Sequence, residues 1–465
     1  HCCYGTSIGS LILDLLSLYV THSVFAENNY GVYNGTTAYL TLQESAIYSN
    51  TQYGVYNANT GYTLNATNNW WGSATGPTHI SNPGGTGDRI TDRVTYSPWQ
   101  SVAPVTLPAP LPVLPTPPVP TQVSGSITAN ATWTTNNSPY IVIGDVTVNA
   151  GVQLTIQPGV VVKFQAGRSL IINGILDAQG VEDNHIVFTS VKDDSVGGDS
   201  NGDGSASFPA RGDWGRLVFN DSSVDALTKV RFAEVRYGGS TGSAIYVDAA
   251  SPTITDNTIH QNSGYGLHVR NTSAPTVQRN WILDNASGGI RLELTSTGNL
   301  ADNRIWGNGG YAIYMDATCY PVLSGNEAYY NDVNGVRVSG NVTFNQTWYA
   351  NLVYVIEGAL TVNSGPALTL RPGTVVKFKD ASSYLTVNGA LIADGTGDVP
   401  IIFTSLRDDA YGGDTDNDDG AYWPMPGDWQ RIMFTDSSDD SRCILRHTLI
   451  RYGGATNNQS VMLDS

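Results

Sequence analysis

The stretch DNTIHQNSGYGLHVR, residues 256–270, decides the fold because its asparagines return at a fixed spacing. Two columns of asparagine recur every 23 residues: Asn257, Asn280, Asn303 and Asn326, and Asn262, Asn285, Asn308 and Asn331. The same spacing separates two copies of YGVYN, at residues 30–34 and 53–57. One repeat length therefore governs two distant regions of the chain, which indicates a stacked repeat architecture.

Each 23-residue unit is too short to hold two packed helices, and its apolar residues alternate, as at Ile290, Leu292 and Leu294. Alternation with a period of two predicts short strands joined by turns. Stacking such units buries one face of every strand and pairs each backbone edge with the next coil. The sequence therefore predicts an all-β fold, a parallel β-helix. Asparagines at a fixed place in each coil tolerate left-handed turn conformations and can hydrogen-bond to their counterparts one coil away, so we interpret the columns as structural ladders at turns.

A longer duplication lies on top of the 23-residue unit. Residues 127–250 are echoed by residues 342–465, where HIVFTSVKDD returns as PIIFTSLRDD and RGDWGRLVF returns as PGDWQRIMF. We interpret residues 124–340 as β-helix module 1. Residues 341–465 are module 2, an incomplete repeat of module 1 that continues directly from it.

The first part of the chain is interpreted as a separate domain. Residues 1–100 read as the C-terminal part of a β-helix, and residues 68–99, rich in aromatics, glycine and proline, read as its closing cap. Residues 101–123 form a linker, and the eight prolines between residues 103 and 120 predict a stiff polyproline II spacer. The prediction is thus two β-helical parts joined by a proline-rich linker.

Composition excludes several classes of function. The chain has 23 Lys and Arg against 40 Asp and Glu, a formal charge of −17, which disfavours binding to nucleic acid or anionic lipid and favours divalent cations. No apolar run reaches the roughly 18 residues of a membrane span. The four cysteines, Cys2, Cys3, Cys319 and Cys443, have no spacing typical of a zinc site, and the sequence does not set their oxidation state.

The coils resemble the right-handed parallel β-helix repeats of the pectate-lyase-like superfamily, in the form found in large secreted or surface prokaryotic proteins. NNWWG at residues 68–72, followed by NPGG and SPW, resembles the end of such a helix. LTIQPGVVVKF, with FTS and GDW, resembles a leading segment. The resemblance implies this fold and an extracellular or cell-surface location. It leaves the activity open, because the superfamily includes lyases, hydrolases, epimerases, adhesins and structural spikes.

Two acidic, glycine-rich stretches predict metal sites: GGDSNGDG at residues 197–204 and GGDTDNDDG at residues 412–420. Oxygen-bearing residues that alternate with small ones let a tight loop aim several oxygens at one point, as Ca²⁺ requires. The stretches resemble the first half of an EF-hand, but Ala210 and Met425 stand where a bidentate Glu would be needed. The alternative is a solvated acidic turn. The predicted Ca²⁺ ligands are Asp193, Asp194, Asp199, Asn201, Asp203 and Asp213 in the first loop, and Asp408, Asp409, Asp414, Asp416, Asp418 and Asp428 in the second.

No catalytic residue is predicted, because the GHG and RIK signatures of polygalacturonases are absent. At the 23-residue spacing, one outward ladder combines His268, Arg291, Tyr314 and Arg337, with Arg270, Glu293 and Asp316 beside it. Ordinary cross-strand pairing explains such a ladder, and a glycan-binding groove is the alternative. His185 and His260 have no partner at catalytic spacing and are assigned no role.

The sequence thus favours an extracellular, calcium-stiffened structural protein, a stalk, adhesin or filament subunit. The alternative is a polysaccharide-binding or polysaccharide-cleaving β-helix protein, with glycans as partners. Both ends, near Ile8–Leu18 and Val461–Ser465, read as cut within a β-helix, so we expect head-to-tail self-association. The alternative interpretation of these ends is that the chain is a fragment of a longer repetitive polypeptide. Sequons such as Asn34, Asn65, Asn130, Asn271 and Asn341 leave glycosylation open.

Overall fold

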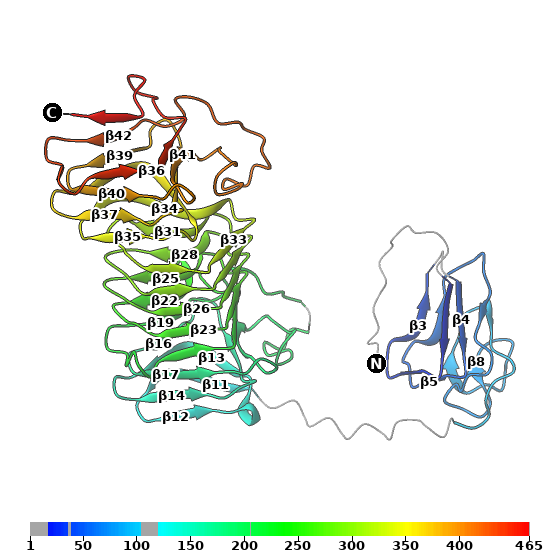
Figure 1. Ribbon diagram of the computed structural model, residues 1–465. Helices are drawn as coiled ribbons and strands as arrows, with labels where there is room; N and C mark the ends of the chain where they lie inside the picture. The colour runs from blue at the N-terminus through cyan, green and yellow to red at the C-terminus, as the bar shows by residue number, and fades with distance from the viewer. Residues whose placement is uncertain (1–16, 36–38, 104–119, 205, 465) are drawn as a thin grey trace. The chain divides into compact units, whose positions relative to one another are not determined.

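The computed structural model describes residues 17–35, 39–103, 120–204 and 206–464 (Figure 1). The chain divides into two compact units, His1–Pro115 and Thr116–Ser465. Most of the proline-rich stretch, residues 104–119, lies outside the described residues, as do Cys2, Cys3 and the part of the expected self-association surface between residues 8 and 16.

The first unit is built of parallel strands from successive coils. Its two YGVYN copies pair in register, with Tyr30 opposite Tyr53 and Tyr33 opposite Tyr56. After the last coil, single parallel bridges join Ala46 to Trp70 and Val55 to Ile90. The strands are β1 (Ser17–Thr21), β4 (Tyr39–Gln43), β7 (Leu64–Asn65) and β10 (Val94–Thr95) in one sheet, β2 (Val24–Ala26) with β5 (Ala46–Tyr48), β3 (Tyr30–Asn34) with β6 (Tyr53–Asn57), and β8 (Pro77–Thr78) with β9 (Gly87–Arg89).

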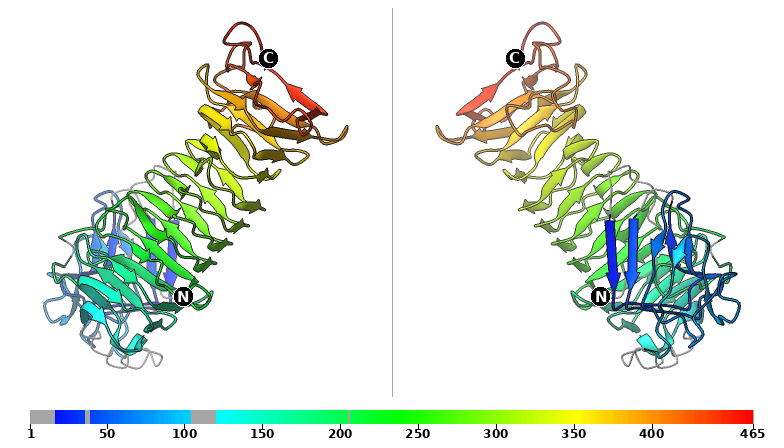
Figure 2. Two further views of the ribbon diagram at one scale, coloured as in Figure 1. Left: turned by 90° about the vertical axis from the view of Figure 1, so that its left-hand side faces the viewer. Right: turned by 90° about the vertical axis from the view of Figure 1, so that its right-hand side faces the viewer.

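The second unit is a stack of coils whose named strands all pair in parallel, and the views of Figure 2 show the coils succeeding one another along it. Two smaller sheets cover one side. The first holds β12 (Ala131–Trp133), β14 (Gln153–Ile156), β17 (Ile175–Gln179), β20 (Lys229–Arg231), β23 (Thr253–Thr255), β26 (Thr276–Gln278), β29 (Asn299–Ala301) and β32 (Val322–Ser324). The second holds β35 (Gln346–Trp348), β37 (Ala367–Leu370), β40 (Ala390–Asp394) and β43 (Ile444–Arg446).

The largest sheet of the second unit has 23 strands and contains two strands from most coils. The strands are β11 (Thr121–Ile127), β13 (Tyr140–Val148), β15 (Val161–Phe164), β16 (Leu170–Ile172), β18 (Ile186–Ser190), β19 (Leu217–Phe219), β21 (Ala233–Arg236), β22 (Ser243–Asp248), β24 (Thr258–His260), β25 (Tyr265–Arg270), β27 (Trp281–Leu283), β28 (Gly288–Leu292), β30 (Arg304–Trp306), β31 (Tyr311–Asp316), β33 (Glu327–Tyr329), β34 (Val333–Val342), β36 (Val353–Val362), β38 (Val375–Phe378), β39 (Tyr384–Val387), β41 (Ile401–Ser405), β42 (Ile432–Phe434), β44 (Thr448–Ile450) and β45 (Val461–Leu463). The only helical element among the described residues is a 3-10 turn, η1 (Thr135–Asn137). The predicted all-β parallel β-helix is therefore confirmed.

The core follows from the alternation seen in the sequence. Each strand presents one face to the interior, so the columns of the stack consist of like residues, such as Ile259, Ile282 and Ile305, which are essentially fully buried. One hydrophobic cluster runs without a break from Trp133 to Phe434. Modules 1 and 2 therefore share a single continuous core.

The asparagine columns form two buried ladders, as predicted. Asn285 is fully buried, and its Nδ2 donates to Asn308 Oδ1 and to the carbonyl oxygen of Ile259, each at 3.0 Å. Asn262 Nδ2 in turn donates to Asn285 Oδ1 at 2.8 Å. The ladder satisfies polar groups that would otherwise be orphaned inside the stack.

The ladder asparagines do not adopt the left-handed conformation that asparagine tolerates. The positive φ belongs to the residue just before each one: Asp256, Gln261, Arg279, Asp284, Asp302, Gly307, Gly325 and Tyr330. A left-handed residue there turns the chain sharply, and the asparagine that follows points its side chain inward.

The module duplication repeats an aromatic packing unit. Trp214 stacks on Phe164 with 4.2 Å between ring centroids, and Trp429 stacks on Phe378 at 3.9 Å. Both indoles are fully buried, and Trp214 Nε1 donates to the carbonyl oxygen of Arg236 at 2.8 Å. The GDW motif therefore anchors the end of a long loop in the core of each module.

Candidate metal centres

Each module carries one long insertion, and both leave the same sheet at equivalent places. Insertion 1 comprises residues 191–216, between β18 and β19, and insertion 2 comprises residues 406–431, between β41 and β42. Both project from the same side of the stack in Figure 1, as a green and an orange trace. The two acidic stretches therefore sit on equivalent loops of one scaffold.

A buried lysine holds each insertion against the outer face of the sheet. Lys163 in β15 and Lys377 in β38 are fully buried. Lys163 Nζ donates to the carbonyl oxygen of Gly198 at 2.5 Å, and Lys377 Nζ donates to that of Gly413 at 2.8 Å. Side chains alternate across a strand, so these lysines would face solvent without the insertions above them. Each insertion therefore packs on the sheet, and the lysine beneath it hydrogen-bonds to its backbone.

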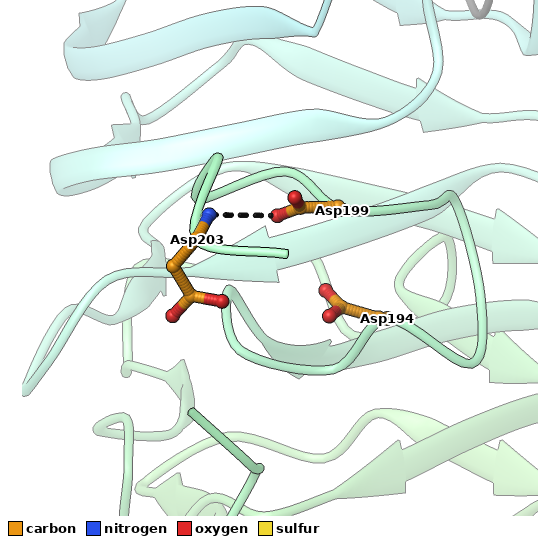
Figure 3. Close-up of side chains that lie close together, drawn as sticks. All are labelled: Asp194, Asp199 and Asp203. Atoms are coloured by element: carbon orange, nitrogen blue, oxygen red, sulfur yellow. Dashed lines mark hydrogen bonds between the residues drawn. The ribbon is translucent and has the colours of Figure 1, made fainter. Parts of the chain in front are cut away.

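Three carboxylates of insertion 1 converge. Ligand atoms of Asp194, Asp199 and Asp203 all lie within 4.8 Å of one another. Figure 3 shows the three side chains around a common space, with the backbone amide of Asp203 donating to Asp199. The backbone amides of Gly202 and Gly204 also donate to Asp199, each at 2.8 Å, and these bonds lower the pKa of its carboxyl. The loop thus holds one carboxylate ionised and points two more toward it.

Insertion 2 repeats the arrangement. Ligand atoms of Asp409, Asp414 and Asp418 lie within 4.8 Å of one another. Asp414 accepts from the backbone amides of Asp418 at 3.0 Å and Asp419 at 3.1 Å, and Asp418 accepts from that of Gly420 at 2.7 Å. The two clusters are built from equivalent positions, since each residue of the second lies 215 places after its counterpart in the first.

Both clusters include an oxygen that is buried and has no hydrogen-bond partner among the described residues. These atoms are Asp194 Oδ1 and Asp409 Oδ1, and Asp416 Oδ1 is a third beside the second cluster. A buried acceptor without a donor is costly, and a hard cation would satisfy it. Carboxylate oxygens suit Ca²⁺, which takes about six to eight oxygens at roughly 2.3–2.6 Å. The donor set therefore fits calcium, with remaining ligands available from backbone carbonyls or water.

Four predicted ligands lie at the bases of the insertions instead, outside these clusters: Asp193, Asp213, Asp408 and Asp428. Asp193 accepts from Arg236 Nε at 2.9 Å, and Asp213 accepts from Ser190 Oγ at 2.8 Å. In module 2, Asp408 lies 3.6 Å from Arg451 Nη1. Asp428 accepts from Ser405 Oγ at 2.7 Å. These carboxylates fasten the insertions to the stack.

The equivalent residues Asn201 and Asp416 also differ from the clustered carboxylates. Asn201 Nδ2 donates to Asp203 Oδ2 at 2.8 Å, so its amide braces a cluster member. Burial, and then the nearby charge of Asp418, raises the pKa of Asp416 to about 6. The metal-free insertion 2 therefore does not fully stabilise the ionised form of Asp416.

The buried lysines offset part of this charge. Burial lowers the pKa of Lys377 to about 8, although the carboxylates of Asp409 and Asp416 favour its charged form. Burial likewise raises the pKa of Asp409 despite Lys377. Sequence reasoning missed both lysines, because VVKF reads as an alternating strand with a solvent-facing lysine. The repetition of VVKF below each acidic loop was the available signal.

The charged ladder lies on adjacent strands in the predicted register. His268 pairs with Arg291, Arg291 with Tyr314, and Tyr314 with Arg337. His268 Nε2 lies 2.8 Å from Glu293 Oε2, and Arg291 also pairs with Glu293. Arg291 and Arg337 also lie over the ring of Tyr314, at 4.9 and 4.2 Å from its centroid, so cross-strand contacts join the ladder, as the sequence favours.

Arg270 and Asp316 flank the ladder. Arg270 Nη1 donates to Tyr246 Oη at 3.2 Å. Burial, and then the charge of Glu293, raises the pKa of Asp316. His260, for which the sequence offers no partner, lies 2.8 Å from Glu234 Oε1. Glu234 lies one coil earlier and is opposite Thr258, so the contact runs diagonally across the strands and spans 26 residues, outside the 23-residue interval.

Comparisons with known proteins agree with this architecture. Residues 217–373 match the family model of the right-handed β-helix region, and residues 340–416 match that of the pectate-lyase-like β-helix domain. A 66-residue stretch is 38% identical to Protein bark beetle of Drosophila melanogaster, covering 14% of this chain and 2% of that protein. No solved structure matches the chain. Within the described ranges, no helix is long and apolar enough to cross a membrane.

Proposed function

We propose that this chain, a right-handed parallel β-helix repeat protein with a fold of the pectate-lyase-like type, is an extracellular structural protein whose stack is stiffened by calcium at its two insertions. One observation carries the proposal: three carboxylates come together in each insertion, and one buried oxygen of each cluster has no hydrogen-bond donor among the described residues. These oxygens belong to the equivalent residues Asp194 and Asp409. A duplicated arrangement of this kind is what two structural cation sites require.

Further observations support a structural role. The core is continuous through both modules, so coils stacked in this way transmit force along one axis. The charged ladder is occupied by its own ion pairs, such as His268 with Glu293. An extracellular setting supplies calcium at concentrations that weak oxygen-only sites can use. A stalk or an adhesin on a cell surface is the role we assign.

Calcium should raise the melting temperature of the metal-free protein. A ligand that binds only the folded state stabilises it by about 2.7 kcal/mol at a concentration of 100 times Kd. The double variant Asp199→Asn with Asp414→Asn should lose this shift, because it removes a central carboxylate from each cluster. Differential scanning calorimetry with EDTA and with increasing Ca²⁺ measures the effect.

The matched control for this experiment is Asp183→Asn with Asp398→Asn, which removes the same charge at two exposed turns. The control should retain the full calcium shift. Identical melting curves in EDTA and in millimolar Ca²⁺ would refute calcium binding. Cleavage of an acidic polysaccharide by the purified chain would instead favour the alternative function, a polysaccharide-cleaving protein.

The calcium effect should also depend on pH, because protons compete with the ion. The pKa of Asp416 is raised to about 6, above its value in an unfolded chain, so between about pH 4 and 6 the metal-free folded state binds the extra proton. The metal-free protein should therefore lose stability as pH rises from about 4 through 6. Over the same interval, calcium binding should become stronger, because the carboxylate loses its proton. The calcium-induced shift should be large at about pH 7.5 and should shrink at about pH 5. A shift of equal size at both values would contradict this coupling.

A further inference from the structure

A pocket of about 490 Å³ lies between insertion 2 and the coils beneath it. Residues of β33 and its following turn form one wall, and Asp414, Asn417 and Asp419 of insertion 2 form another. Its volume falls within the range typical of ligand sites. Of its lining residues, only Asp414 belongs to a metal cluster, and none belongs to the charged ladder.

Exposed aromatic rings line this pocket. Tyr329 and Tyr330 line it and are 53% and 64% exposed. Trp306, one coil earlier, stacks on Tyr330 with 5.2 Å between ring centroids and also contacts Tyr329. Large aromatic side chains left in solvent at a concave site mark a surface that binds something.

The walls of the pocket carry negative charge only. Glu327, Asp414 and Asp419 line it, together with asparagines, glycines and apolar residues such as Leu352 and Val375, and no Lys, Arg or His is among the lining residues. The net charge of the whole chain has the same sign. An anionic ligand is therefore disfavoured, whereas a cation gains from both the carboxylates and the aromatic faces.

The neighbouring coils show how such a cation is held. Arg304 lies over the ring of Trp281, 4.9 Å from its centroid, and its Nε lies 3.3 Å from Glu327 Oε2. The Trp281 ring and the Glu327 carboxylate thus both contact the Arg304 guanidinium on this outer face. The lining of the pocket also contains aromatic rings and carboxylates, Tyr330 and Asp419 among them, and no basic residue.

The site is also continuous with an elongated surface. Trp281 pairs with Arg304 and then Glu327 across three adjacent strands, while Leu283, Trp306 and Tyr329 form the parallel column. Adjacent strands lie about 4.8 Å apart, so the columns provide contacts over several residues of an extended chain. A polymer fits this surface better than a small ion does.

We propose that the pocket receives an arginine or lysine side chain from a basic segment of a partner protein, with the rest of the segment lying along the Trp281–Tyr329 columns. The carboxylates neutralise the incoming charge, and Tyr330 and Trp306 cover its aliphatic or guanidinium faces. Of the lining carboxylates, Asp414 also belongs to the second calcium cluster, whereas Glu327 and Asp419 do not, so the pocket keeps two carboxylates of its own when calcium is bound.

The test is titration of the full chain with fluorescein-labelled hexa-arginine, followed by anisotropy at about 0.15 M salt. The wild type should bind, and Tyr330→Gln with Asp419→Asn should weaken binding by about tenfold or more. Both substitutions tolerate the positive φ of these positions, and Gln stands at the equivalent position 261. Folding of the variant is checked by an unchanged melting temperature in EDTA.

The control Asp183→Asn with Asp398→Asn removes charge elsewhere and should bind as the wild type does. Equal weakening by this control would overturn the proposal, since it would show attraction to the overall charge only. Binding of a neutral hexasaccharide but not of hexa-arginine would also overturn it, in favour of a glycan. If free arginine bound with the same affinity as the hexapeptide, the proposal of an extended partner segment would be wrong, because the adjacent columns would then contribute nothing to binding.

Titrations in EDTA and in Ca²⁺ separate this inference from the calcium proposal. Equal affinity in both conditions supports an independent pocket, whatever the melting curves show. Displacement of the peptide by Ca²⁺ at concentrations that raise the melting temperature would overturn the inference, because the negative charge would then belong to the ion site.

Discussion

Asn285→Ala is expected to destabilise the second unit by about 3 kcal/mol or more, although the change removes only a small polar side chain. The Asn285 side chain takes part in four hydrogen bonds, with Asn262, Ile259 and Asn308. All of these groups are buried, so alanine leaves donors and acceptors unpaired in the middle of a ladder. Thermal unfolding measures the loss, and hydrogen exchange at the Asn262 amide should accelerate most.

Asn136→Ala is the matched control, because Asn136 is exposed and belongs to no ladder. It should change the melting temperature little. If Asn285→Ala unfolds at the same temperature as this control, the ladder does not hold the stack together and the packing of the apolar columns suffices.

Lys377→Met is expected to release insertion 2 while the coils remain folded. Methionine fills similar space but cannot donate to the carbonyl oxygens of Gly413 and Leu406. It also leaves the carboxylates around Asp409 and Asp416 without their nearest cation. Removing one partner from a buried charged network costs about 3–5 kcal/mol. Limited proteolysis without calcium should therefore cut the chain within residues 406–431, with fragments that stay associated.

Lys379→Met is the control on the neighbouring outward position, where the lysine pairs with Glu357 and is 38% exposed. It should leave insertion 2 resistant. Calcium should partly restore resistance to Lys377→Met, because the ion supplies the missing positive charge. Proteolysis of both variants at equal rates would show that the apolar contacts of Val353, Val355 and Leu406 hold the insertion without the lysine.

The fold was predictable because a stacked coil repeats its residues at a constant interval. The columns of the central coils, such as Ile259 with Ile282 and the asparagine ladders, correspond to a 23-residue interval that is visible in one sequence. Columns in other coils, such as Leu170 opposite Leu217, do not follow this interval. The turn conformation was not predictable in the same way. Asn and the residue before it recur together, so the spacing alone could not show which of the two is left-handed.

The candidate metal sites were predictable only in part. The alternating acidic residues Asp199 and Asp203 signal a cation loop by themselves, and the structure brings them to Asp194. Asp193 and Asp213 look the same in sequence, yet Arg236 and Ser190 occupy them. Arg236 lies on the next coil, and Ser190 ends the strand before insertion 1, 23 residues before Asp213. Pairing over such distances leaves no local pattern in the sequence.

The ladders also govern how such a chain can change in length. Each asparagine of the central coils donates to its counterpart one coil away. A deletion or duplication of one plain coil, such as residues 280–302, therefore joins equivalent residues at both ends. The two insertions lie on either side of these plain coils. The separation between them is therefore adjustable in steps of about 4.8 Å, one coil at a time, without altering either insertion.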